Sequence, residues 1–257
     1  MKSIISAVKS WLKRHPRFYD FVIGVIKRNV LRERSAAYEM LNEFSRSRGG
    51  RVSFVQIGAN DGLRGDPIRE FIVRDPWTGV LIEPLAPVFE LLKKNYAWLS
   101  GRRSLAFENA AISTSESTLS LFTVANHVLD SLSLEAQLDL LRKSSLHREH
   151  LERFVRNPSD VVQVTVPCIT VESVVEKHFG GNRLDLLSVD AEGHEAAILK
   201  SVDFAKTRIS AIFFESCHLG DEKETLLRHL ELHGFALREA EGDAFAVRPD
   251  AMIHALE

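Results

Sequence analysis

Two carboxylates and a histidine stand at alternate positions in the segment DAEGHE, directly after the apolar run LDLLSV. They are Asp190, Glu192 and His194. A carboxylate or imidazole within hydrogen-bond reach of a hydroxyl can accept its proton, as transfer of a group to oxygen requires. We predict Asp190 as the base or acceptor-orienting group, with His194 second and Glu192 beside them. For His194 the alternative is an ordinary solvent-facing residue at a helix start.

A divalent metal ion is another way to activate a hydroxyl, and Asp190, Glu192 and His218 offer ligand atoms. The glycine between Glu192 and His194 leaves no recognised ligand spacing, and the chain has only two cysteines. We therefore expect metal-free chemistry. Cys217 is interpreted as a small buried residue rather than a nucleophile.

The segment FVQIGANDG, residues 54–62, also ends an apolar run in glycine and polar residues. Gly58 and Gly62 permit a tight turn or the close approach of a ligand. The segment has neither the lysine of a phosphate loop nor the G-x-G-x-x-G of a dinucleotide site. Glu83, after the run GVLI, offers acceptor atoms for both hydroxyls of a ribose. Together these features predict a nucleoside cofactor without a pyrophosphate, and S-adenosylmethionine fits.

The elements that must position these residues alternate between strand and helix patterns. Apolar runs predict strands at 51–58, 79–84, 104–112, 184–190 and 209–215, with helical spacing between them. Residues 235–249 predict an antiparallel hairpin that turns at 241–243. This alternation predicts an α/β fold with a doubly wound, mostly parallel sheet, whose polar strand ends meet at one edge.

Residues 113–165 interrupt the alternation with apolar residues spaced as in one or two helices. Arg142, Arg148, Arg153 and Arg156 lie among them. An insertion of this length is often a lid, and guanidinium groups there would suit an anionic acceptor. A solvated helical decoration without a ligand role is the equally open alternative.

Composition sets broader limits. The chain has 257 residues and a formal net charge of −2, which gives no reason to expect nucleic acid as a partner. Two cysteines favour a reducing, cytoplasmic setting.

Charge is uneven along the chain, because residues 1–34 hold nine lysines and arginines against two acidic residues. We predict a basic amphipathic helical arm over 1–48 and one domain over 49–257. The apolar run within the arm is too short to cross a bilayer. It either lies on an anionic membrane surface or packs on the domain or on a second subunit.

Five segments, in this order, resemble the FkbM-type S-adenosylmethionine-dependent methyltransferases: VQIGANDG, LIEP, NAAIS, VPCITVESVV and LLSVDAEGHEAAILKS. The resemblance covers roughly residues 52–217. It implies a Rossmann-like methyltransferase domain. It also implies methyl transfer from S-adenosylmethionine to a hydroxyl oxygen of a sugar, glycan or natural product.

The resemblance also implies roles for single residues. Gly58, Ala59, Asn60 and Gly62 would line the methionine part of the cofactor, Glu83 would bind the ribose, and Asn109 and Ala110 would lie near the adenine. The family often has an acidic residue where this chain has Gln56, so Asp61 is the other candidate for that contact. Gln56 and the basic arm motivate an alternative function, a nucleoside-binding or scaffold protein that keeps the fold without turnover.

Overall fold

The computed structural model describes residues 15–20, 22, 35–115, 117–181, 183–240 and 242–255. The predicted amphipathic arm falls mostly on residues 1–14, 21 and 23–34, which lie outside the described residues. Two described pieces of this region are helical, residues 16–20 and α3 (Ala36–Ser47). In the part of the chain that is described, no helix combines the length and the apolar character needed to span a bilayer.

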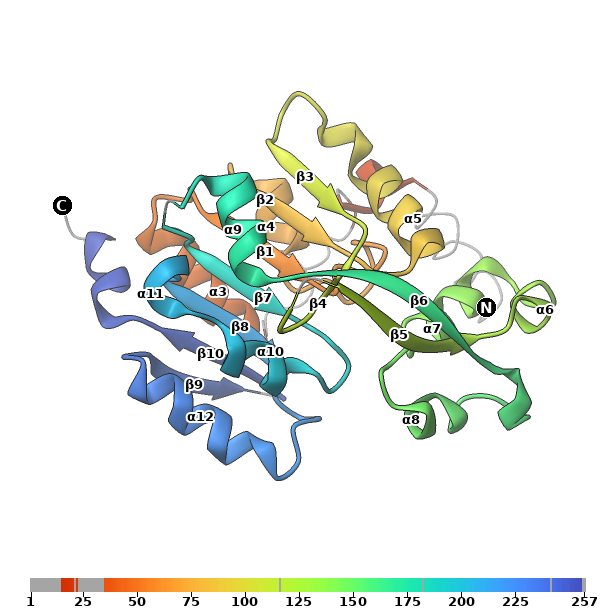
Figure 1. The fold of residues 1–257 in the computed structure, drawn as a ribbon. Coiled ribbons are helices and arrows are strands. Elements are labelled where there is room, and N and C mark those ends of the chain that lie inside the picture. Colours follow the sequence, from red (N-terminus) through yellow and green to blue (C-terminus); the bar gives the residue numbers. More distant parts are fainter. Residues whose placement is uncertain are drawn as a thin grey trace.

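The main sheet has seven strands in the order β3-β2-β1-β7-β8-β10-β9 (Figure 1). They are β1 (Ser53–Ile57), β2 (Thr78–Ile82), β3 (Leu105–Glu108), β7 (Leu186–Val189), β8 (Ala211–Glu215), β9 (Ala236–Ala240) and β10 (Asp243–Val247). The first five are parallel, whereas β10 pairs antiparallel with both β8 and β9. The predicted fold class, Rossmann-like with an antiparallel carboxyl-terminal hairpin, is confirmed. The chain order reverses between β1 and β7, which is where such sheets bind ligands.

Helices cover both faces of this sheet. One face carries α3, α4 (Arg69–Arg74) and α5 (Ala86–Tyr96). The other carries α9 (Val171–Phe179), α10 (Glu195–Ser201), α11 (Phe204–Thr207) and α12 (Glu222–Leu232). Because side chains alternate along a strand, Phe54 enters the first core and Val55 enters the second.

Local signals explain where two of these helices begin and end. Pro87 lies in the first turn of α5, where its missing N–H costs nothing. A capping box formed by Thr170 and Ser173 begins α9, and Gly180 ends it in the left-handed conformation at φ 59°.

A second, three-stranded sheet is the main departure from the sequence analysis. Its order is β4-β6-β5, with β4 (Ala111–Ile112), β5 (Ser117–Val124) and β6 (Val161–Ile169). The segment 104–112, predicted as one strand, is divided between β3 of the main sheet and β4 of this one. Between β5 and β6 lie α6 (Asn126–Leu129), α7 (Leu134–Leu141) and α8 (Arg148–Glu152).

The predicted helices of the insertion are therefore present, but long antiparallel strands flank them. Apolar and polar residues alternate in STLSLFTV and VVQVTV, and this period of two is the strand signal that the helical interpretation overlooked. Figure 1 shows the ribbon of β5 and β6 extending beyond the main sheet, with α6, α7 and α8 at its far end.

Candidate functional site

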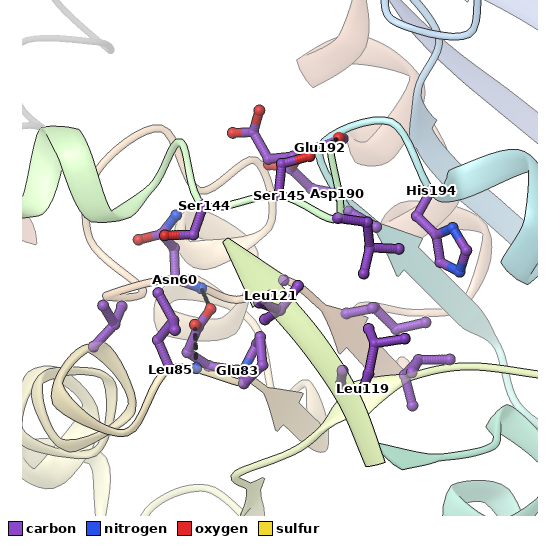
Figure 2. A pocket seen from close by; sticks show the side chains of 18 of the residues that line it. Asn60, Glu83, Leu85, Leu119, Leu121, Ser144, Ser145, Asp190, Glu192 and His194 are labelled. Carbon is purple, nitrogen blue, oxygen red and sulfur yellow. Dashed lines mark hydrogen bonds between the residues drawn. The ribbon is translucent and has the colours of Figure 1, made fainter. Parts of the chain in front are cut away.

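A pocket lies at the carboxyl ends of β1, β2 and β7 (Figure 2). Its floor is formed by strand-end residues, including Gly58, Glu83 and Asp190. The insertion closes it from above, because β5 carries Leu119 and Leu121 across it and the loop after α7 adds Ser144 and Ser145. The pocket thus lies at the switch point of the sheet, beneath the second sheet.

Gly58 can only be glycine in this arrangement. Its φ is +71°, and a Cβ atom there would lie 1.7 Å from the backbone oxygen of Asp190. The two strand ends are held together because the Asp190 N–H donates to Ile57 O at 3.1 Å. The missing side chain therefore lets β1 and β7 end side by side and leaves backbone facing the pocket.

Glu83 fixes the turn that follows β1. Its Oε2 accepts the Asn60 N–H at 3.1 Å, and its Oε1 accepts the Leu85 N–H at 2.9 Å (Figure 2). The residue is only 6% exposed. Burial raises the Glu83 pKa to about 7, opposed by the two backbone N–H groups and reinforced by Asp61. Each carboxyl oxygen has a further lone pair, so the group can still accept hydrogen bonds from a ligand.

Seven of the twelve residues predicted for the site line this pocket: Gly58, Asn60, Glu83, Ala110, Asp190, Glu192 and His194. The other five, Gln56, Ala59, Asp61, Gly62 and Asn109, lie behind its wall.

Three of these five hold the backbone of the site. Asp61 accepts the N–H groups of Leu63 at 3.1 Å and Arg64 at 3.0 Å. At Gly62 a Cβ atom would lie 2.5 Å from a Tyr96 ring carbon. Asn109 donates to the carbonyl oxygens of Glu83 at 2.8 Å and Pro84 at 3.0 Å. Each supports a loop that faces the pocket.

Gln56 points to the opposite face of β1 from its neighbour Ile57, which lines the pocket. Its Nε2 donates to Asp66 Oδ1 at 3.1 Å. The same carboxylate accepts the N–H groups of Ile68 at 2.9 Å and Arg69 at 3.0 Å, and the Tyr96 hydroxyl at 3.1 Å. Sequence reasoning missed Asp66 because nothing in the run LRGDP marks it as the centre of a buried network.

Carboxylates crowd the end of β7. Oxygens of Asp190, Glu195 and Glu215 lie within 4.8 Å of one another. Asp190 is open to the pocket, but protein encloses its carboxyl group on the other sides. This burial, followed by Glu215, Glu192 and Glu195, raises the Asp190 pKa to about 7, while Arg142 opposes the shift.

Glu195 is the member of this group that the sequence analysis missed. It is fully buried, and its carboxylate accepts the N–H groups of Ala191 at 2.7 Å and Gly193 at 3.1 Å. The sequence feature that could have identified Glu195 is its position as the last residue of DAEGHE, which falls in the first turn of α10. Glu195 therefore closes the loop that carries Asp190 and Glu192 into the pocket.

Ligand atoms of Glu215, Cys217 and His218 also lie within 4.8 Å of one another and could meet a metal ion. Cys217 is exposed, which corrects the expectation that it is buried. It follows β8, where its backbone N–H donates to Gly242 O at 3.0 Å and leaves the side chain outside the core.

Glu192 connects the strand end to the insertion. Its φ is +48°, its carboxylate lies 3.8 Å from Lys143 Nζ and 3.6 Å from His150 Nε2, and its carbonyl accepts the Ser145 hydroxyl at 3.4 Å. His194 stands at the other side of the pocket in Figure 2. Burial, followed by the charge of His147, lowers the His194 pKa, so this imidazole is neutral near pH 7.

Only one of the four arginines predicted for the insertion lines the pocket, Arg142. Arg148 pairs with Glu152 at 2.7 Å and donates to Pro158 O at 2.6 Å. Arg153 and Arg156 are exposed and stand outside the pocket wall. Among the groups described in this structure, none hydrogen-bonds or pairs with the Arg142 guanidinium.

Comparison with known proteins supplies further findings. The family model described as the methyltransferase FkbM domain matches residues 56–239. No curated protein matches the chain in sequence.

The solved structures that are similar to this chain include three methyltransferases. One is methyltransferase FkbM from Methylobacillus flagellatus KT, with a TM-score of 0.47 and 10% identity over 77% of this chain and 44% of that one. This chain thus corresponds to less than half the length of that protein. An O-methyltransferase from Bacillus cereus in complex with SAH has a TM-score of 0.42 and 11% identity, over 88% of this chain and 96% of that one. A precorrin-6y C5,15-methyltransferase from Geobacter metallireducens GS-15 has a TM-score of 0.38 and 12% identity, over 81% of this chain and 87% of that one.

Proposed function

Because the chain belongs to the methyltransferase FkbM domain family, we propose that it transfers a methyl group from S-adenosylmethionine to a hydroxyl oxygen of a sugar, glycan or natural product. One observation carries the proposal. A single pocket at the switch point joins Glu83, a group suited to a ribose, with Asp190, a carboxyl group whose pKa lies near 7. Glu83 would bind the ribose of a nucleoside cofactor, and Asp190 would accept the proton of an acceptor hydroxyl in the same pocket.

The pocket residues fit such a cofactor. Glu83 has lone pairs for the ribose hydroxyls, and Leu85, Val88 and the segment 110–112 offer an apolar wall for an adenine ring. The glycine at position 58 leaves open backbone where a side chain cannot stand, which suits the methionine part. When bound, S-adenosylmethionine supplies an electrophilic methyl group on a sulfonium.

Asp190 serves as the base. With its pKa at about 7, a large share of this side chain is ionised at neutral pH, yet it remains basic enough to accept a proton from a hydroxyl. His194 is the second group within the same pocket that can accept a proton. Glu192 is directed towards Lys143 and His150 of the insertion, at 3.8 and 3.6 Å, so its role is to position the loop rather than to take the proton.

The acceptor is an anionic sugar or glycan bound by Arg142. Arg142 lines the pocket together with Ser144 and Ser145, and no carboxylate among the described residues hydrogen-bonds to its guanidinium. A guanidinium can bind a carboxylate or phosphate through two parallel hydrogen bonds.

The test has two steps. S-adenosylhomocysteine is titrated into the protein by calorimetry, and labelled S-adenosylmethionine is then incubated with a panel of acidic and neutral glycans and natural products. Methylation of one acceptor, with kcat rising from pH 6 to 8 and falling at least ~100-fold in Asp190→Asn, supports the proposal. Binding without methylation of any acceptor would favour the non-catalytic nucleoside-binding alternative, and no binding at all would reject both.

A further inference from the structure

A buried arginine stands directly behind the turn that follows β1. Arg69, at the start of α4, is 4% exposed. Its Nη1 donates to the carbonyl oxygen of Gly62, and its Nη2 donates to Asn95 O at 3.1 Å. Its guanidinium also lies 4.5 Å from the centre of the Tyr96 ring. The cation therefore binds the last residue of the turn from below.

The partner of this cation comes from the amino-terminal segment, 49 positions earlier. Asp20 Oδ1 accepts from Arg69 Nε at 2.8 Å, and Asp20 Oδ2 accepts from Nη2 at 2.9 Å. The two side chains are 8% and 5% exposed, so water hardly competes for either. Two parallel bonds between carboxylate and guanidinium fix the orientation of both groups as well as their distance.

Adjacent contacts support the same arrangement. Tyr19 is partly buried and feels the charges of Arg69, Asp20, Asp61 and Arg64, so the helical residues 16–20 lie against the turn itself. On the turn, the Asn95 side chain donates to Asp61 O at 2.8 Å. The backbone of residues 61–62 is thus held from below by Arg69 and Asn95, and Arg69 is held by Asp20.

We infer that Asp20 and Arg69 position the cofactor turn, so that the amino-terminal segment forms part of the methyltransferase site. The inference rests on the proposed function in taking this turn as a cofactor site. That Asp20 and Arg69 hold the turn in place does not depend on the cofactor. Asp20 supplies the only carboxylate that the described structure shows in direct contact with the Arg69 guanidinium. Without it, the Nε–H of a buried cation loses its acceptor, and the guanidinium loses the partner that fixes its orientation at Gly62.

The experiment compares Asp20→Asn with a matched control, Asp185→Asn, in the full chain. Asp185 is also a carboxylate paired with an arginine, Arg48, and its side chain is 20% exposed. It precedes β7 and accepts from the backbone N–H and the hydroxyl of Ser53, at the amino ends of the strands and away from the pocket. Two quantities are measured for each folded variant: amide hydrogen exchange of residues 59–64 in the unliganded protein, and the Kd of S-adenosylhomocysteine.

We expect Asp20→Asn to accelerate exchange in residues 59–64 and to raise the Kd at least about tenfold, since small misplacements of binding groups cost up to ~100-fold. Asp185→Asn should lower Tm while leaving both quantities unchanged. Asp20→Glu, which keeps the charge, should bring the Kd back to within about threefold of the wild type. Arg69→Lys replaces Asp20→Asn if the latter does not fold, because one ammonium cannot reach Asp20, Gly62 and Asn95 in the same geometry.

Unchanged exchange in residues 59–64, or an equal loss of affinity in both asparagine variants, would overturn the inference. If the wild type binds no S-adenosylhomocysteine, the proposed function fails instead. The exchange measurement then still decides whether Asp20 holds the turn, so the two failures are distinguishable.

Discussion

At the scale of the residue, Gln56 shows how a side chain can be essential to the site's support without touching the pocket. Its amide N–H₂ donates to Asp66, a buried carboxyl group that three further groups also contact. Burial raises the Asp66 pKa, while Arg69 and these hydrogen bonds oppose the shift. An acidic residue at position 56 would face this carboxylate directly, so the amide and Asp66 are complementary.

The first prediction follows from that pair. Gln56→Glu should lower the free energy of unfolding by about 2 kcal/mol at pH 8, because two close carboxylates cannot both ionise. The loss should shrink towards pH 5, where one of them is protonated and can donate to the other. Urea unfolding at the two pH values measures this, with Gln56→Met as an uncharged control. Equal losses for Glu and Met at pH 8 would contradict the electrostatic explanation.

Glu83 is the residue on which the cofactor assignment depends most directly. Glu83→Ala should weaken S-adenosylhomocysteine binding by about 1.5–3 kcal/mol, the range for hydrogen bonds that involve a charged group. The variant also leaves the Asn60 and Leu85 N–H groups without their acceptor. A modest drop in Tm is therefore expected beside the loss of affinity. Calorimetry that finds a folded variant with wild-type affinity would remove Glu83 from the ribose site.

At the scale of the element, the sequence predicts the strand ends well and the insertion only in part. Gly58, Glu83 and Asp190 each follow a run of apolar residues, and parallel strands of one sheet bring such ends together. The direction of Gln56 could not be read, because a strand of five residues buried on both faces has no polar side to orient it.

The insertion resisted prediction for a different reason. Its helices are local and follow from leucine spacing, whereas the pairing of β5 with β6 joins residues that are 37 (Val124 and Val161) to 51 (Ser117 and Cys168) positions apart. Nothing local therefore indicates which of its arginines faces the strand ends. Arg142 does so because it directly follows α7, whose Leu138 and Leu141 pack beside Leu121 of β5.

This placement gives a prediction for the insertion. Arg142→Gln should raise the acceptor KM about tenfold or more, as expected for the loss of a charged hydrogen-bonded contact, with an unchanged Kd for S-adenosylhomocysteine. Arg153→Gln is the matched control, because that side chain is exposed outside the pocket wall. Steady-state kinetics on an acidic acceptor makes the comparison. A normal KM in Arg142→Gln would leave the insertion without a role in acceptor binding.

At the scale of the whole molecule, the charge distribution separates the amino-terminal region from the body. Residues 1–34 carry nine basic and two acidic side chains, in a chain whose net charge is −2. If this region binds an anionic membrane surface, the full chain should associate with phosphatidylserine vesicles at 20 mM salt. It should dissociate above about 0.1 M salt, where exposed charges are screened within ~10 Å. Flotation with neutral vesicles is the control, and no association with the anionic vesicles at low salt would point instead to packing on the domain or on a second subunit.

The body of the molecule concentrates acidic groups instead, because several carboxylates meet at the end of β7. An unfolded aspartate titrates near ~3.9, whereas the folded protein holds the Asp190 pKa at about 7, through burial and then Glu215, Glu192 and Glu195. As the pH rises from 4 to 8, Asp190 ionises first in the unfolded chain, so the folded state loses stability over this window. Asp190→Asn removes this pH-dependent loss of stability.

The unliganded Asp190→Asn variant should consequently be more stable than the wild type by about 1 kcal/mol at pH 8, a value kept small because solvent reaches this side chain. At pH 4 the difference should be much smaller, since the carboxyl group is then neutral in the folded state and about half neutral in the unfolded one. Chemical unfolding across the pH range measures the difference, and Asp130→Asn, outside the carboxylate group, is the control. The same variant should have lost turnover, so a gain in stability with a loss of activity would identify Asp190 as a group kept for chemistry at the expense of the fold. If the gain in stability of the variant over the wild type is no larger at pH 8 than at pH 4, the crowded carboxylates do not destabilise the folded protein.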